Sequence, residues 1–308
     1  MAGHGHAPTR YLAARLPQRR QPGRNATGYS AADPKNAVDG PSTTLPQAPG
    51  EAEANPEKPA AADPLVSRVM SGPVGYAEPP VPAFLFDLDG TLIDSVYQHV
   101  IAWRAALSRL DIDLSVWRIH RRIGMSGGLF VSALLRETGR TLSEEDIALL
   151  QQAHGDEYLA QADSVRPLPG AADLLAALTE RGVRWAIATS GYRSTAAHAL
   201  HMLGLPDDAP MITRDKVRHA KPDPDLFLAA AAALGVEPRH AWVVGDSVWD
   251  LLAARRAGAL GVGLLSGGYG REELERAGAY RVYADPADLL ARADELGVRD
   301  LSVPRLST

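Results

Sequence analysis

The 308-residue sequence contains no cysteine, and this absence excludes several chemistries at once. Disulfide bonds, thiolate metal sites and cysteine nucleophiles are all ruled out, while the redox compartment stays undetermined. No apolar run approaches the 18 residues that a membrane-spanning helix needs, the longest candidate being residues 226–234. We therefore expect no membrane span, and we expect a cytoplasmic protein.

A strong charge of one sign is also missing. The formal net charge is −5, which offers no dominant basic field and argues against nucleic acid as a partner. Lysine is scarce, with four residues against 28 arginines. The remaining composition, 45% hydrophobic and 22% charged, is typical of a globular protein of one large or two modest domains.

The first 80 residues show no sustained periodicity and are rich in Pro, Ala, Gly, Asn and Ser. This composition predicts a disordered N-terminal arm. Five arginines precede the first acid, Asp33, which fits either an organelle transit peptide or the general arginine bias of the chain. No apolar segment follows them, so a secretory signal is disfavoured.

The most informative segment is residues 83–95, AFLFDLDGTLIDS. An apolar run that leads into two acids is typical of a strand buried on both faces that delivers carboxylates to its carboxyl end. Asp87 and Asp89 point the same way along an extended chain and would repel each other without a cation or a shared proton. Oxygen-only ligands suit Mg²⁺, and the turn at Gly90 could present amides to phosphate. The alternative is that the two acids cap the next helix.

The order of elements predicts an α/β fold. Helical patterns at residues 96–110, 130–135 and 144–159 form an insert. The segment Pro167–Gly170 ends this insert, and the residues that follow, up to Leu178, return as a helix to the main domain. Strands and helices then alternate, which indicates a parallel sheet that binds ligands outside the carboxyl ends of its strands. The expected strands are 185–189, 211–213, 241–245 and 261–265, and the expected helices are 194–203, 224–234 and 250–257.

Further polar residues fall at these strand ends. Thr189 and Ser190 suit phosphate at a strand-to-helix turn, or a helix cap. Lys221 is a compact ammonium that could neutralise a phosphoryl oxygen, or a solvated surface lysine. Asp246 and Asp250 would share one helix face if a helix began near Asp246, which would allow metal binding; they could instead cap that helix.

The ordered segments FDLDGT, IATSG, KPDPDLF and GDSVWD resemble the four motifs of the haloacid dehalogenase-like (HAD) hydrolases. The resemblance implies a Rossmann-like core with a small inserted helical cap, as in the phosphoglycolate phosphatase and β-phosphoglucomutase branch. The implied division is a disordered extension at 1–80, a core at 81–95 and 167–293, a cap at 96–166 and a C-terminal tail at 294–308.

The same resemblance implies the roles of the site residues. Asp87 is the expected nucleophile that becomes an aspartyl phosphate, and Asp89 is the expected acid and base. One Mg²⁺ is expected on Asp87, the main-chain carbonyl of Asp89 and Asp246, with Asp250 in support. Phosphate contacts are expected from Leu88, Asp89, Thr189, Ser190, Gly191 and Lys221.

Two departures from the patterns of related subfamilies reduce the number of activities that fit the sequence. Dehalogenases of this fold lack the second acid that is present here as Asp89, and phosphonatases use a cap lysine, whereas no lysine occurs between Lys58 and Lys216. Two alternatives to a phosphatase stay open: a phosphosugar mutase and a catalytically inactive binding module. The candidate cap residues, at positions that resemble the mutase pattern or lie near it, are His99, Trp103, Arg118, Arg121 and Arg122, of which His99 and Arg122 are the candidate substrate contacts. The alternative is structural: His99 would be a packed helix residue, which its place on a helix face favours, and the arginines would form a solvated helix face.

The expected activity is therefore Mg²⁺-dependent hydrolysis of a small phosphorylated metabolite. The sequence leaves the identity of that substrate open. It also leaves open whether the protein is a monomer or a homodimer.

Overall fold

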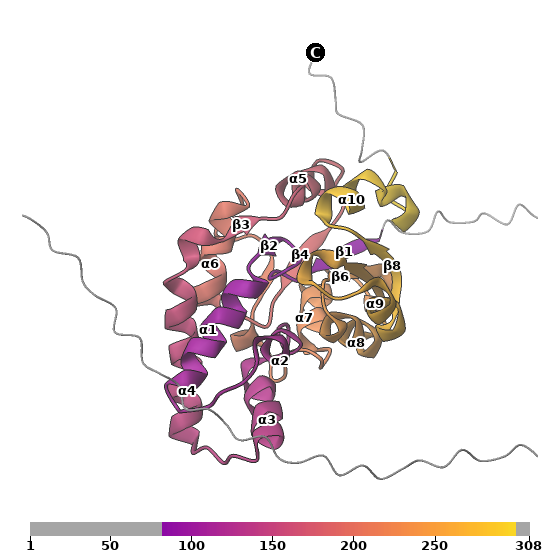
Figure 1. The fold of residues 1–308 in the computed structure, drawn as a ribbon. Coiled ribbons are helices and arrows are strands. Elements are labelled where there is room, and N and C mark those ends of the chain that lie inside the picture. The colour runs from indigo at the N-terminus through magenta and orange to yellow at the C-terminus, as the bar shows by residue number, and fades with distance from the viewer. Residues whose placement is uncertain (1–81, 300–308) are drawn as a thin grey trace, which may run out of the picture. The chain divides into compact units, whose positions relative to one another are not determined.

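The computed structural model describes residues 82–299, and within them six parallel strands form one sheet in the order β5-β4-β1-β6-β7-β8 (Figure 1). The chain builds the sheet outward from β1 in both directions, so the strand order reverses beside β1, and such a point is where α/β sheets bind ligands. The predicted α/β, Rossmann-like fold is confirmed. The strands are β1 (Ala83–Phe86), β4 (Trp185–Ala188), β5 (Met211–Ile212), β6 (Ala241–Gly245), β7 (Leu260–Leu264) and β8 (Ala279–Tyr283).

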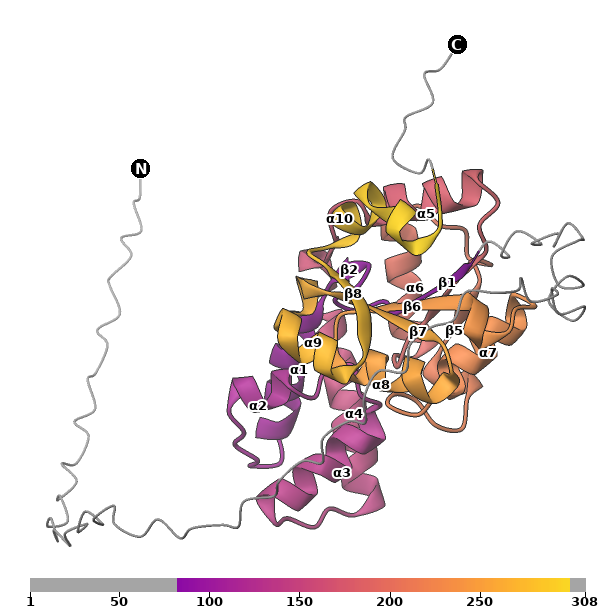
Figure 2. The same ribbon diagram turned by 90° about the vertical axis from the view of Figure 1, so that its right-hand side faces the viewer.

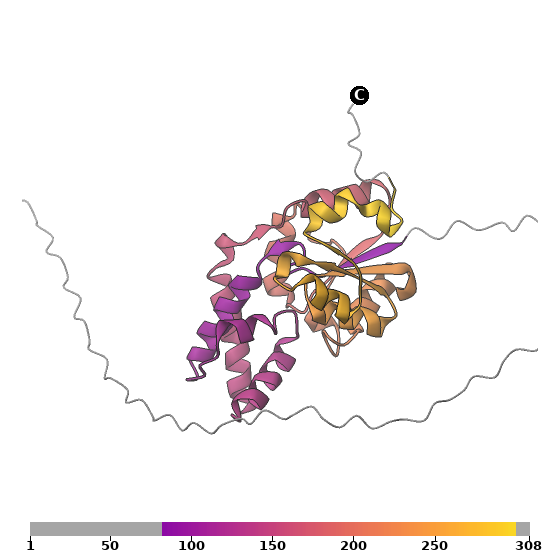
Figure 3. The same ribbon diagram turned by 45° about the vertical axis from the view of Figure 1, so that its right-hand side comes forward.

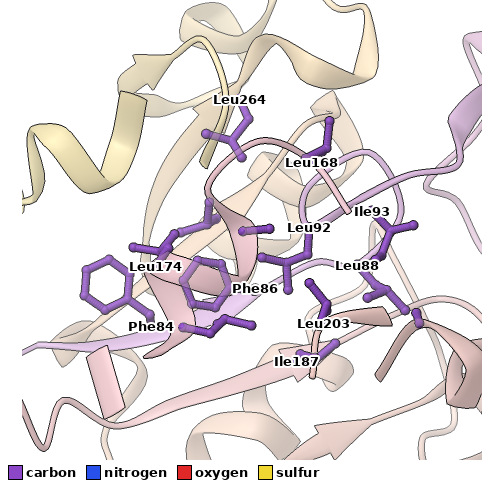
Figure 4. Packing of buried hydrophobic residues seen from close by; sticks show 14 of the residues in the cluster. Phe84, Phe86, Leu88, Leu92, Ile93, Leu168, Leu174, Ile187, Leu203 and Leu264 are labelled. Atoms are coloured by element: carbon purple, nitrogen blue, oxygen red, sulfur yellow. The ribbon is translucent and has the colours of Figure 1, made fainter. Parts of the chain in front are cut away.

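Strand β1 is buried on both faces, as its continuous apolar run predicts. Phe84 and Phe86 point into one hydrophobic cluster, and Ala83 and Leu85 point into another on the opposite face. Figure 4 shows the first cluster, where the two phenylalanine rings meet side chains from neighbouring strands and helices. This burial fixes the register of β1 and therefore the position of the two acids that follow it.

Helices cover both faces of the sheet (Figure 2). The face that Phe84 and Phe86 line is covered by α5 (Ala171–Glu180), α6 (Arg193–Met202) and α10 (Pro286–Ala291). The other face is covered by α7 (Asp225–Ala233) and α8 (Val248–Ala257), with α9 (Arg271–Ala277) packed beside α8. Short 3₁₀ helices complete the connections: η1 (Ala162–Ser164), η2 (Arg214–Lys216), η3 (Pro238–His240), η4 (Leu265–Gly267) and η5 (Ala293–Leu296).

Four helices within residues 96–159 form the helical insert (Figure 3). The insert packs around a hydrophobic cluster of its own. The two-residue strands β2 (Ile93–Asp94) and β3 (Arg166–Pro167) pair antiparallel at its base, where the chain leaves and re-enters the sheet domain. The insert places a second wall next to the carboxyl end of β1. Its helices are α1 (Val96–Ser108), α2 (Val116–His120), α3 (Gly127–Thr138) and α4 (Glu144–Leu159).

Some elements differ from the sequence prediction. Helix α8 begins at Val248, because Ser247 is its N-cap, so Asp246 precedes the helix instead of sharing its face with Asp250. Helices α2 (Val116–His120), α9 and α10 and strand β8 were not predicted from the sequence. The predicted disordered arm at 1–80 and most of the predicted tail lie outside the described residues. Among residues 82–299, no helix combines the length and apolar character that a bilayer crossing requires.

Candidate active site

The carboxyl end of β1 places Asp87 beside β6. The Asp87 amide donates a hydrogen bond of 2.8 Å to the carbonyl of Val244, which extends the strand pairing by one residue. The chain then turns at Gly90, where φ is +81°, a left-handed conformation that favours glycine. A Cβ at this position would lie 2.6 Å from Asp246 Oδ2, so the turn also needs glycine because the acid that follows β6 approaches it closely.

Three carboxylates from two distant segments meet at this point. Asp87, Asp246 and Asp250 are all buried, and each offers one oxygen such that the three atoms lie within 4.8 Å of one another. The Thr91 hydroxyl donates a hydrogen bond of 3.0 Å to Asp246 Oδ1. Asp250 Oδ2 accepts hydrogen bonds from the Ser247 amide (3.1 Å) and hydroxyl (2.6 Å). This acid therefore caps the N-terminus of α8 and also belongs to the carboxylate cluster.

Lys221 is fully buried among these acids. Its ammonium lies against Asp87 Oδ1 and 2.8 Å from Asp250 Oδ1. Burial alone would lower the pKa of Lys221, but the carboxylates of Asp250 and Asp87 raise it above its ordinary value, so the side chain is a cation. The surface-lysine interpretation of the sequence is therefore wrong.

One ammonium does not balance three buried acids. Burial raises the pKa of Asp87 to about 7, with Asp250 and Asp89 adding to the effect and Lys221 opposing it. Burial together with Asp250 and Asp87 also raises the pKa of Asp246 well above its ordinary value. The cluster thus lacks positive charge, and a divalent ion with oxygen ligands would supply it. An all-carboxylate donor set fits Mg²⁺.

Asp89 is held by a separate group of side chains. Its Oδ1 accepts a hydrogen bond of 2.6 Å from the Ser95 hydroxyl and lies 3.2 Å from His99 Nε2. Burial would raise the pKa of Asp89, but His99 and Ser95 hold it below its ordinary value. His99 Nδ1 is in turn 3.1 Å from His154 Nε2. The structure therefore connects Asp89 to α4 of the helical insert through two imidazoles.

Aromatic stacking fixes both imidazoles. The ring of His99 stacks on Tyr158 at 4.0 Å between centroids, and that of His154 stacks on Trp103 at 4.1 Å. Burial, with His99 adding to it, lowers the pKa of His154 well below its ordinary value, so this ring is neutral. The sequence analysis named His99 and Trp103 but missed His154 and Tyr158, although their spacing of four residues places them on one face of α4.

The turn after β4 lies on the other side of Asp87. Thr189 is buried, and its Oγ1 accepts a hydrogen bond of 3.0 Å from the Gly191 amide. The Ser190 hydroxyl donates a bond of 3.1 Å to the carbonyl of Gly124 in the helical insert. The Leu88 side chain is buried in the hydrophobic cluster of Figure 4, so only its backbone is available to a ligand.

A cavity of about 110 Å³ opens between the sheet and the helical insert. The sheet side contributes Asp87, Asp89 and the residues after β4 to the lining. Three residues of the buried cluster do not line the cavity: Lys221, Asp246 and Asp250. They lie behind Asp87, which Lys221 contacts directly and which shares the cluster with the other two acids. The predicted site residues thus converge at one place. The insert contributes His99, Trp103, Arg122, Phe130, Gln151 and His154 to the lining.

The arginines in α2 and directly after it point in different directions. Arg122 lines the cavity, yet its guanidinium forms an ion pair with Glu137 and donates to the carbonyl of Arg118 at 2.7 Å. Arg118 pairs with the same Glu137. Arg121 instead points toward the sheet domain, where it pairs with Glu273.

The carbonyl of Arg121 joins the insert to the sheet domain. It accepts hydrogen bonds from Trp249 Nε1 (3.3 Å) and from the Tyr269 hydroxyl (2.9 Å), and the Arg121 guanidinium lies over the Tyr269 ring at 4.1 Å. His120 Nε2 lies 2.8 Å from the carbonyl of Gly267. These contacts hold the helical insert against the sheet domain, and the cavity lies between the two.

Comparison with known proteins agrees with this geometry. The family model of haloacid dehalogenase-like hydrolases matches residues 81–258. The phosphoglycolate phosphatase of Rhodospirillum rubrum is 34% identical over 215 residues, which cover 67% of this chain and 88% of that protein. The crystal structure of a hydrolase from Pseudomonas syringae shares 52% identity, with a TM-score of 0.69 over 70% of this chain and 99% of that chain.

A β-phosphoglucomutase from Clostridium difficile shares the fold at 24% identity, with a TM-score of 0.62 over 70% of this chain and 96% of that chain. The matched family segment includes all three buried carboxylates and Lys221, the residues that the fold brings together at the end of β1. The chain belongs to the haloacid dehalogenase-like hydrolases.

Proposed function

We propose that the protein is a Mg²⁺-dependent phosphatase that hydrolyses a small phosphomonoester through a phosphorylated Asp87. The observation that carries the proposal is the buried cluster of three carboxylates and Lys221, which contacts a cavity through Asp87. A buried set of acids with one lysine is costly to fold unless a cation and an anionic ligand complete it. Relatives named as phosphatases support the same activity.

Asp87 is the proposed nucleophile because it is the one member of the cluster that lines the cavity. The Mg²⁺ would be held by Asp87, the main-chain carbonyl of Asp89 and Asp246, with Asp250 in support. When bound, the ion would neutralise charge on the phosphoryl oxygens. Lys221 lies against Asp87 behind the cavity lining, and its ammonium is proposed to bridge Asp87 and a phosphoryl oxygen bound next to it. The Thr189 hydroxyl is proposed to contact the phosphoryl oxygens from the cavity wall, while backbone groups of Leu88, Ser190 and Gly191 orient them.

Asp89 is the proposed general acid and base. Its carboxylate faces the cavity and is oriented by Ser95 and His99. A phosphomonoester dianion next to Asp89 would raise its pKa by repulsion between like charges, so the acid form would be favoured when substrate binds. Asp89 would then protonate the departing oxygen and afterwards accept a proton from the water that attacks the phosphorylated Asp87.

The test is Mg²⁺-dependent release of p-nitrophenol from p-nitrophenyl phosphate. Asp87→Asn should reduce turnover to background, because an amide cannot form the acyl phosphate. Asp94→Asn is the matched control, since Asp94 is exposed on β2. Wild-type protein that releases no p-nitrophenol with Mg²⁺ would favour the inactive binding module, and substantial turnover by Asp87→Asn would exclude this nucleophile.

A phosphosugar mutase is the second candidate, favoured by the contact between His99 and Asp89 and by the shared fold. A mutase must hold a second phosphate, and among the described cavity residues Arg122 is the cation placed for it, but Glu137 neutralises Arg122. We therefore favour hydrolysis. Interconversion of β-glucose 1-phosphate and glucose 6-phosphate, dependent on a bisphosphate primer, would reverse this preference.

A further inference from the structure

The cavity has two chemically different ends, and what their chemistry implies for the substrate rests on the function proposed above. Asp87 and Thr189 mark the end where phosphate would bind. The leaving group would therefore extend toward the helical insert, past Asp89. What the insert presents there decides which phosphomonoesters fit.

The insert end offers little free positive charge. Three of its lining residues could carry a charge: His99, Arg122 and His154. His99 contacts Asp89 through one nitrogen and His154 through the other. His154 is stacked on Trp103 within the hydrophobic part of the insert. A carboxylate on the substrate would need Arg122 as its cation. The carboxylate of Asp89 faces the same space and would repel a substrate carboxylate.

Arg122 already has an anion. Glu137, in the last turn of α3, places one carboxylate oxygen against Arg122 and the other against Arg118. Arg122 also donates to the Arg118 carbonyl at 2.7 Å, so two of its nitrogens are bound within the insert. The side chains of Arg122 and Glu137 are 20% and 21% exposed, so each is covered mostly by other residues.

The remaining wall of this end is neutral. Trp103 and Phe130 stack on each other at 4.2 Å and give it an apolar surface. The Gln151 amide is half-buried in the lining, and a Cβ added to Gly127 would lie 3.8 Å from its Nε2. No hydrogen bond joins the Gln151 side chain to another residue within 82–299. An amide has a donor and an acceptor, the pair that a hydroxyl group complements.

We propose that Glu137 is a specificity-determining residue: by neutralising and holding Arg122, it makes the cavity select phosphomonoesters of uncharged, hydroxyl-bearing compounds such as polyols and sugars over those that carry a carboxylate. Gln151 contacts a hydroxyl of such a leaving group. The chain would then differ in substrate from the phosphoglycolate phosphatases to which it is similar.

The test compares kcat/KM for sorbitol 6-phosphate and 2-phosphoglycolate, each divided by kcat/KM for p-nitrophenyl phosphate. The wild-type protein should prefer the polyol phosphate by about tenfold or more, because a carboxylate here would lack a cation. Glu137→Gln keeps the shape of the side chain but frees Arg122. The ratio of the normalised kcat/KM for sorbitol 6-phosphate to that for 2-phosphoglycolate should therefore fall by roughly tenfold. Glu273→Gln frees Arg121, which is not a cavity residue, and should leave the ratio unchanged.

Two further variants keep the proposal testable if Glu137→Gln is unstable. Arg122→Gln should leave the ratio within about twofold of wild type, because Arg122 serves no substrate carboxylate. Gln151→Leu should lower the relative rate on sorbitol 6-phosphate by about tenfold, the loss expected from one unpaired hydroxyl. Preference of the wild type for 2-phosphoglycolate, or a tenfold loss on 2-phosphoglycolate in Arg122→Gln, would overturn the inference. Absence of p-nitrophenyl phosphate hydrolysis would instead overturn the proposed function, and with it this inference.

Discussion

The hydroxyl of Thr91 donates a hydrogen bond of 3.0 Å to Asp246 Oδ1 and so joins the turn after β1 to the end of β6. Both groups are buried, and the bond orients one of the acids proposed to hold Mg²⁺. Loss of a group that orients a metal ligand in this way typically lowers metal affinity or activity by roughly tenfold or more.

We expect Thr91→Val to raise the Mg²⁺ concentration needed for half-maximal activity by about tenfold, with a smaller effect on kcat at saturating Mg²⁺. A Mg²⁺ titration of p-nitrophenyl phosphate hydrolysis measures this. Thr138→Val is the control, because the Thr138 hydroxyl bonds to the carbonyl of Leu134 at the end of α3. An unchanged titration midpoint in Thr91→Val would show that this bond does not orient the metal ligand.

The raised pKa values of Asp87 and Asp246 predict how stability depends on pH without metal. In the folded protein Asp87 binds its proton up to a pH of about 7, whereas the unfolded chain releases it near pH 3.8. Between these values the folded state binds more protons, so the free energy of unfolding falls as pH rises. Asp246 changes in the same direction. Asp89, with its lowered pKa, acts in the opposite direction, and only at more acidic pH.

Mg²⁺ should therefore raise the melting temperature more at pH 7.5 than at pH 5, because protons compete with the ion at acidic pH. At a concentration of 100 times its Kd, a ligand stabilises by about 2.7 kcal/mol, which corresponds to roughly 5–10 °C in a domain of this size. Thermal unfolding in EDTA and in MgCl₂ at both pH values measures the effect. An equal shift at both pH values would contradict the protonation of these acids.

Much of the site could be predicted from the sequence because it follows from local patterns. The apolar run before Asp87 predicted a buried strand, and the rule that ligands bind at the carboxyl ends of parallel strands placed Thr189 and Asp246 near it. The helix expected at 250–257 begins slightly earlier, at Val248, and the considered start near Asp246 was wrong. Ser247 and Asp250 have the spacing of a capping box, which would have indicated that the helix begins after Ser247 and that Asp246 lies outside it.

The contacts of the helical insert could not be predicted in the same way. His99 and His154 are 55 residues apart, and they meet only because α1 packs against α4. Glu137 looks like an ordinary surface acid in the sequence, and its pairing with Arg122 depends on how α3 follows α2. Strand β8 was missed because its exposed residues, Tyr280 and Arg281, interrupt the apolar pattern of an edge strand.

Loss of the His99–His154 contact should lower kcat/KM more for substrates whose leaving group must be protonated. His154→Phe keeps an aromatic ring on Trp103 but removes the hydrogen bond to His99, which is one of the contacts that orient His99 toward Asp89. An alkyl phosphate needs a proton from Asp89 as its leaving group departs, whereas p-nitrophenolate is a weak base and leaves without one. We expect kcat/KM to fall by about tenfold for sorbitol 6-phosphate, with a much smaller loss for p-nitrophenyl phosphate. His198→Phe, at an exposed position of α6, is the control. Equal losses on both substrates would indicate that His154 only stabilises the fold.

Gly267 tests how closely the backbone of η4 approaches the proposed metal site. A Cβ at Gly267 would lie 1.7 Å from Asp246 Oδ2, a distance that no side chain tolerates, so Gly267→Ala must displace the carboxylate or the segment after β7. We expect activity to fall by about 100-fold or more, because a displacement of about 1 Å at a catalytic centre is enough for such a loss. Mg²⁺ should also lose its stabilising effect in thermal unfolding. Gly128→Ala, where an added Cβ has no atom within 4 Å, should behave like wild type. Near-normal activity and an intact Mg²⁺ response in Gly267→Ala would show that Asp246 does not need its observed position.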